Sequence, residues 1–164
     1  MTNEVPGSSN PSAAGTDNSF AEGALPESGN IPFALAAGIV AAIVGAAIWA
    51  GITVATEYQI GWMAVGVGFL VGIAVRQFGR GSTPVYGVIG AALALVGCVL
   101  GNVLTLVAFF SIGEEISFFA ALGAVDFAKV PAILIETGSP IDLLFYGIAI
   151  SAGYKTSILQ TDAG

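Results

Sequence analysis

Residues 33–55 read FALAAGIVAAIVGAAIWAGITVA, and this uncharged, strongly apolar stretch decides the fold class. A helix rises about 1.5 Å per residue, so about 20 helical residues cross the ~30 Å hydrocarbon core of a bilayer. Residues 33–55 are long enough to do so. Asn30 and Pro32, just before the stretch, are typical of a helix start. The sequence therefore predicts a transmembrane helix here.

Three further apolar stretches follow, and polar or charged residues separate them. They cover about residues 60–76, 84–110 and 140–155. The first of the three is short and stops at Arg76, while Thr83 and Pro84 supply a cap and a first-turn proline for the next. Ser139 and Asp142 have the spacing of a capping box before the last. We therefore expect an all-α, polytopic transmembrane helix bundle with four spans.

The composition of the chain excludes several classes of function. Of the 164 residues, 55% are hydrophobic and only 9% are charged, against roughly 25% charged in soluble domains. Cys98 is the single cysteine and there is no histidine, which argues against zinc sites and against histidine-dependent catalysis. The net charge of -7 argues against nucleic-acid binding. We expect no cofactor and no enzymatic activity, and the lipid bilayer as the main partner.

The two ends of the chain differ from the apolar part. Residues 1–31 are rich in Ser, Asn, Gly, Ala and Pro, and their charged residues are all acidic. Such a segment buries too little apolar surface to offset the entropy of ordering. We therefore predict a disordered acidic N-terminal tail, a transmembrane domain over residues 32–156 and a short C-terminal tail over residues 157–164.

The segment between the third and fourth stretches is harder to interpret. Ser111 followed by Glu114 resembles a capping box, which predicts a helix starting there. Pro131 should end or kink that helix near residue 130. We therefore expect an interfacial or re-entrant helix over about residues 112–130.

A fifth span over residues 116–135 is the alternative for this segment. It would place Asp126 and Lys129 near the middle of the bilayer, at about 2.5–3.5 kcal/mol each on an insertion scale. Their i, i+3 spacing would offset part of that cost. A fifth span would also move the C-terminus to the opposite side of the membrane, so the number of spans decides the topology.

The basic residues indicate the orientation. With four spans, Arg76, Arg80 and Lys155 lie on the same side as the N-terminal tail, and Lys129 alone lies on the other. The acidic residues of that other side are Glu57, Glu114, Glu115, Asp126 and Glu136. The positive-inside rule then places both termini in the cytoplasm.

Each expected span carries small residues at i, i+4 spacing, which allow helix backbones to approach closely in lipid. The helix-packing residues that we expect from this spacing are Gly38, Ala42, Gly68, Gly72, Gly97, Gly101 and Gly147. Residues 68–72 also match the GxxxG pattern. The pattern predicts a tight bundle and leaves open whether the contacts form within one chain or between copies.

Three polar residues of the third stretch form a candidate polar path. Asn102 is the most polar side chain deep in a span, with Cys98 one turn before it and Thr105 about one turn after. On one interpretation they line a route for an ion or a substrate. On the other, which we favour, they form hydrogen bonds between or within helices.

Two segments carry a resemblance to a known group of proteins. Residues 58–72, YQIGWMAVGVGFLVG, and residues 142–149, DLLFYGIA, resemble segments of small uncharacterised bacterial integral membrane proteins with four predicted spans. The resemblance covers about residues 33–156. It implies a bacterial inner membrane and supplies neither an activity nor site residues.

Two classes of function remain compatible with these observations. The first is a non-enzymatic scaffold or accessory component that self-associates or binds a membrane-protein partner, as small-residue ridges on four helices favour. The second is a small transporter or channel-like protein with a path near Asn102. An intramembrane enzyme is least favoured, because it would depend on Glu114, Glu115 or Asp126 without any histidine.

Overall fold

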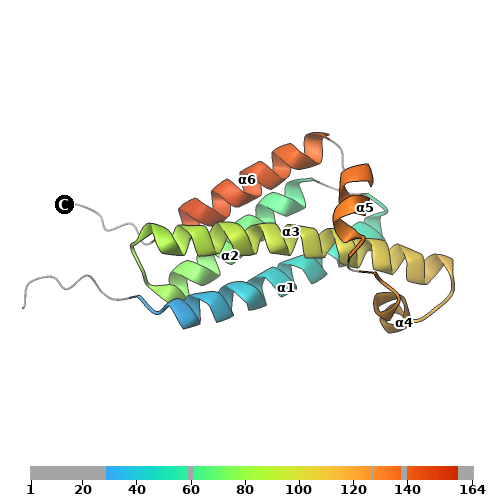
Figure 1. Ribbon diagram of the computed structural model, residues 1–164, viewed down its shortest axis with the longest axis horizontal. Helices are drawn as coiled ribbons and strands as arrows, with labels where there is room; N and C mark the ends of the chain where they lie inside the picture. Colours follow the sequence, from blue (N-terminus) through green and yellow to red (C-terminus); the bar gives the residue numbers. More distant parts are fainter. Residues whose placement is uncertain (1–28, 59–60, 127, 138–139, 159–164) are drawn as a thin grey trace, which may run out of the picture.

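A computed structural model describes residues 29–58, 61–126, 128–137 and 140–158. Within these ranges all regular secondary structure is helical, as predicted. The helices are α1 (Ile31–Thr56), α2 (Trp62–Gly79), α3 (Pro84–Gly113), α4 (Phe118–Gly123), α5 (Val130–Thr137) and α6 (Pro140–Ser157) (Figure 1). The predicted N-terminal tail lies outside the described residues except for its last three, and so does most of the predicted C-terminal tail.

Four long helices form a bundle (Figure 1). Helices α2 and α3 contact each other, and α1 and α6 each pack against both of them. Helix α3 extends past the other three at one end, where α4 packs against it. The start of α1 lies beside the end of α2 at the opposite end of the bundle, since the Asn30 amide donates to the Gly79 carbonyl over 2.7 Å.

The helix starts follow local sequence signals. The Asn30 side chain accepts a hydrogen bond from the Phe33 amide at 3.3 Å and caps α1, with Pro32 in the first turn. Thr83 occupies the cap position of α3 without a side-chain bond. The expected end of the second helix at Arg76 is wrong, because α2 continues to Gly79. A cation in the last turn suits the negative end of the helix dipole and gives the helix no reason to stop there.

The single helix expected over residues 112–130 is not present. Helix α3 runs through Ser111, whose hydroxyl donates to the Ala108 carbonyl at 2.8 Å instead of capping a new helix. The cap that does form is Ser117, which accepts from the Ala120 amide at 3.2 Å and starts α4. Pro131 is the second residue of α5, where its missing N–H costs nothing, so it begins a helix rather than ending one.

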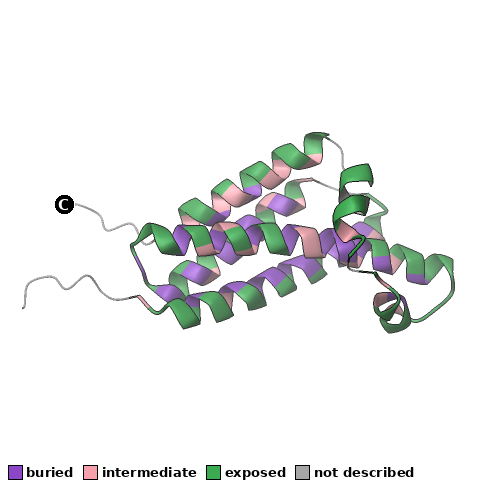
Figure 2. Cartoon of the chain, viewed as in Figure 1, coloured by how far each residue is buried: buried purple, intermediate pink, exposed green. Residues whose placement is uncertain are grey.

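The buried positions of the long helices face the inside of the bundle and the exposed positions face outward (Figure 2). Most of the buried residues are small, and many large apolar residues are exposed. The buried hydrophobic residues are mostly alanines, among them Ala34, Ala42 and Ala94, and Trp49 is the largest fully buried side chain among the described residues. Outward-facing side chains of α1 include Val40 at 60% exposure and Ile43 at 52%. This is the reverse of the size distribution in a water-soluble bundle, where large apolar side chains fill the core.

Three helices, α1, α2 and α3, are long and apolar enough to cross a membrane. Helix α6 matches α2 in length but carries Asp142 in its first turn and Lys155 in its last. The fold is therefore an all-α bundle with three candidate membrane-spanning helices.

Candidate functional site

The polar residues of α3 that were predicted to share a face all point into the bundle. Cys98 is fully buried, and its thiol lies 3.8 Å from the Ala64 carbonyl oxygen of α2, as a weak donor. Thr105 is also buried, and its hydroxyl donates to the Gly101 carbonyl one turn earlier at 2.8 Å. Both side chains are thus paired with helix backbone atoms.

Asn102 links α3 to α6. Its side-chain amide donates to the Tyr146 hydroxyl, and also lies 3.4 Å from the Cys98 carbonyl oxygen of its own helix. Tyr146 is half-buried among the residues packed on the core cluster. The most polar side chain of α3 therefore joins two helices across 44 residues of sequence, which is the geometry of an interhelical hydrogen bond.

Sequence reasoning missed two buried polar atoms on α1. Trp49 and Thr53 lie one turn apart and are each 2% exposed, and neither the indole Nε1 nor the threonine Oγ1 has a hydrogen-bond partner within the described chain. Trp49 packs against α3, since a Cβ on Gly101 would lie 3.0 Å from its ring. A signal was available, because tryptophan and threonine interrupt the face of α1 that carries its small residues.

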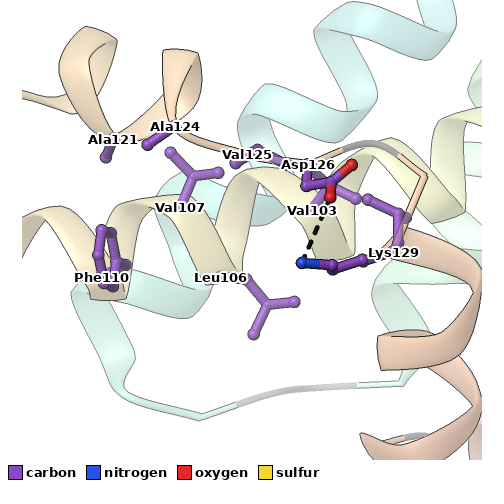
Figure 3. Close-up of a pocket in the computed structure, with 10 residues that line it drawn as sticks. Val103, Leu106, Val107, Phe110, Ala121, Ala124, Val125, Asp126 and Lys129 are labelled. Carbon is purple, nitrogen blue, oxygen red and sulfur yellow. Dashed lines mark ion pairs between the residues drawn. The ribbon is translucent and has the colours of Figure 1, made fainter.

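A pocket of about 300 Å3 lies beside the bundle, where α3 extends past the other long helices (Figure 3). Its apolar walls come from α3 and from α4 with the residue that follows it, namely Val103, Leu106, Val107, Phe110, Ala121 and Ala124. Val125 and Val130 also line the pocket, together with Asp126 and Lys129. The last two form an ion pair, with Lys129 Nζ 3.4 Å from Asp126 Oδ2. The sequence did not predict this pocket, because it depends on the fold-back of α4 onto α3.

The described acidic residues beyond α3 are not gathered into a cluster of metal ligands. No group of three or more His, Cys, Asp or Glu side chains in the described ranges is placed to hold a metal ion. Glu114 and Glu115 are exposed at the end of α3. Asp126 is paired with Lys129 three residues on, and both side chains are more than half exposed.

The small residues on α1, α2 and α3 lie at helix contacts. A Cβ on Gly68 would lie 2.9 Å from the Ala149 Cα of α6, and a Cβ on Gly97 would lie 3.3 Å from the Ala42 Cβ of α1. The remaining buried members of the predicted set are Gly38, Gly72 and Gly101. Gly147 differs, because it is exposed and its Cβ would meet nothing within 4 Å. Within this chain the buried face of α6 consists of Ala149, Gly153 and Ser157, so packing of Gly147 on a second copy stays a prediction.

The three basic residues used for topology gather at one end of the bundle. Arg76 and Arg80 are exposed at the end of α2. Lys155 is exposed in the last turn of α6. That turn meets the first turns of α3, since a Cβ on Gly87 would lie 2.7 Å from the Tyr154 ring. These three charges therefore lie at the end opposite to Lys129 and Asp126.

Comparisons with protein-family models, with curated proteins and with solved structures found no match to this chain.

Proposed function

We propose that this chain is an integral membrane protein that crosses the bilayer four times and acts as a non-enzymatic scaffold or accessory component. The observation that carries the proposal is the size distribution in the bundle, with alanine and glycine between helices and large apolar side chains outside. Exposed apolar surface costs about 25 cal/mol per Å2 in water. In lipid the same surface costs nothing, and helices associate through close backbone packing instead.

Helix α6 is the fourth span in this proposal. Its buried residues Ala149 and Gly153 pack on α2 and α3 in the way that the small residues of α1 do on the other side. Its outward residues include Leu143 at 70% exposure. Asp142 and Lys155 lie in the first and last turns, where they reach the two interfaces and also suit the helix dipole.

The proposed orientation follows from the basic end of the bundle. Arg76, Arg80 and Lys155 lie at that end together with the start of α1, so the positive-inside rule places both termini in the cytoplasm. A bacterial inner membrane, implied by the resemblance of residues 58–72 and 142–149, completes the proposed location.

The polar contacts favour a structural role over transport. Asn102 joins α3 to α6, and Thr105 is bonded to its own helix backbone. The Asn102–Tyr146 bond holds two helices together and the Thr105 hydroxyl is paired within α3, whereas a transport path near Asn102 would require the same groups to be free for a passing solute. We therefore place function on the outer faces, through self-association or a membrane-protein partner.

Single-cysteine accessibility tests the span count. In a Cys98→Ala background, Tyr58→Cys, Ser82→Cys and Lys155→Cys place one thiol on the α1–α2 loop, on the α2–α3 loop and at the end of α6. We expect a membrane-impermeant maleimide to label Tyr58→Cys from outside intact bacterial cells, and the other two only in inverted vesicles. Labelling of Lys155→Cys from the same side as Tyr58→Cys would show that α6 does not cross.

Association is tested separately from topology. Chemical crosslinking followed by blue-native electrophoresis in mild detergent should give a discrete species larger than one chain. A strictly monomeric species without a partner, both in membranes and in mild detergent, would contradict the scaffold proposal while leaving the span count intact.

A further inference from the structure

The pocket beside α3 combines an apolar cradle with two opposite charges at its edge. Val103, Val107 and Ala121 are at most 5% exposed and form its floor. Leu106 and Phe110, at 44% and 50% exposure, lie along α3 (Figure 3). A volume of about 300 Å3 accommodates roughly ten groups of the size of a water molecule, so it suits a segment of an alkyl chain.

The charged groups of Asp126 and Lys129 are exposed, and a backbone hydrogen bond holds the carboxylate in place. The side chains of Lys129 and Asp126 are 74% and 54% exposed, so each has capacity for another ionic partner. Asp126 Oδ1 accepts from the Ala128 amide at 3.1 Å while Oδ2 faces Lys129. Backbone bonding therefore fixes the carboxylate next to the ammonium. The pair has no net charge, so it favours a zwitterionic group lying antiparallel to it over a simple anion or cation.

We infer that this pocket binds one zwitterionic glycerophospholipid with a primary ammonium, its acyl chain on the α3–α4 floor and its headgroup on the Asp126–Lys129 pair. The phosphate would contact Lys129 and the ammonium would contact Asp126. The inference rests on the proposed function, because it requires a bilayer around the bundle.

The position of the pocket fits the boundary between headgroups and acyl chains. Its α3 residues belong to the second half of that helix, toward the end opposite to Arg76 and Lys155. At this end α3 extends past the other long helices (Figure 1). Phe119, on the same short helix α4 as the pocket residue Ala121, is 82% exposed, as expected of an aromatic side chain that enters the interface. A lipid of the outer leaflet therefore has its chain and its headgroup at the depths where the pocket offers apolar and charged contacts.

Photocrosslinking tests whether the pocket binds the acyl chain of a lipid. The full chain is reconstituted in nanodiscs that contain phosphatidylethanolamine with a diazirine on its acyl chain, and crosslinked peptides are mapped. We expect crosslinks to concentrate on residues 103–110. Ala124→Trp fills the pocket from an exposed position and should lower them at least tenfold. The matched control Ala47→Trp, on the exposed face of α1, should leave them unchanged.

Binding of the headgroup by Asp126 and Lys129 is tested by comparing a lipid that carries an ammonium group with one that does not. Native mass spectrometry of the detergent-solubilised chain, equilibrated with equal phosphatidylethanolamine and phosphatidylglycerol, should show preferential retention of the former. Asp126→Asn should reduce that preference about threefold, the scale of one exposed ion pair. Lys129→Gln should reduce retention of both lipids.

Each contrary outcome has a distinct meaning. Even crosslinking over all apolar surfaces, or an unchanged pattern in Ala124→Trp, would overturn the lipid site alone. If a photoreactive amino acid placed at Leu106 instead crosslinks to a second copy of the chain or to residues 1–28, the pocket belongs to that occupant. Absence of lipid crosslinks everywhere on the chain, at residues 103–110 as well as at Val40 and Ile43 of α1, would overturn the membrane proposal, and this inference with it.

Discussion

Gly68→Ala, compared with Gly66→Ala, isolates the close packing of α2 on α6. Both glycines lie in α2, two residues apart. A Cβ on Gly66 would meet nothing within 4 Å, whereas a Cβ on Gly68 would lie 2.9 Å from the Cα and 3.0 Å from the carbonyl carbon of Ala149. Those are backbone atoms of the facing helix, so no side-chain rotation relieves the contact and the two helices must separate.

The expected difference in stability between the two variants contains only the packing cost, because the helix-propensity gain is common to both and cancels. Replacing glycine by alanine inside a helix gains up to about 1 kcal/mol from backbone entropy, and this gain applies equally to both variants. Overpacking costs about 1–3 kcal/mol and applies to Gly68→Ala alone. The two variants should therefore differ by about 1–3 kcal/mol, with Gly68→Ala the less stable.

Cys98 supplies the assay without an introduced cysteine. It is buried and is the only cysteine, so a thiol-reactive fluorophore reports its exposure as the protein unfolds on heating in mild detergent. We expect the midpoint for Gly66→Ala to equal or exceed that of the parent chain, and that for Gly68→Ala to fall below it. Equal midpoints for the two variants would refute the packing of α2 on α6 described above.

Three further predictions concern single contacts. Asn102→Leu and Tyr146→Phe each remove the interhelical hydrogen bond, so each should reduce the free energy of unfolding by about 0.6–2 kcal/mol and lower the same unfolding midpoint. The double variant should lose less stability than the sum of the two single losses. Gly147→Ala should leave the midpoint unchanged or raised, because the added methyl meets open space; a loss comparable to that of Gly68→Ala would show a packing contact there. Ser117→Ala removes the cap of α4 at about 1 kcal/mol, so amide exchange in residues 118–123 should accelerate while the bundle midpoint stays constant.

The long helices could be predicted from sequence because their signals are local. The uncharged run over residues 33–55 and the cap at Asn30 determine α1 without reference to the rest of the chain. The end of α2 could not be placed from Arg76, since a basic residue is favourable both inside a last turn and just after it. Helix α2 ends where Arg80 adopts a left-handed conformation, with φ at 50°. A glycine at this position would have indicated the helix end in the sequence, whereas an arginine does not.

The segment after α3 could not be predicted because two serines offered the same signal. Ser111 and Ser117 both have capping chemistry, and the choice between them depends on whether α3 continues. It continues because Val103 and Val107 pack against Ala121 of α4, a contact made only after the chain turns back. The pocket and its ion pair follow from that turn, so they were beyond reach of a residue-by-residue analysis.

The polar site was predicted in part. Asn102 was identified from its depth in an apolar run, but its partner Tyr146 was not, because tyrosine near a helix start equally indicates a membrane interface. The absence of a contact at Gly147 within this chain could not be predicted, because small residues occur on both faces of α6 and spacing alone does not say which face is buried.

The most direct test of the account asks what surrounds Ile43, an outward-facing side chain near the middle of α1 that is 52% exposed. A spin label at Ile43→Cys, in the Cys98→Ala background and in lipid vesicles, should collide with dissolved oxygen and be protected from a water-soluble nickel chelate. The same label at Tyr58→Cys, on the α1–α2 loop, should show the reverse. Equal access of the chelate to both positions would show that water, and not lipid, surrounds the bundle.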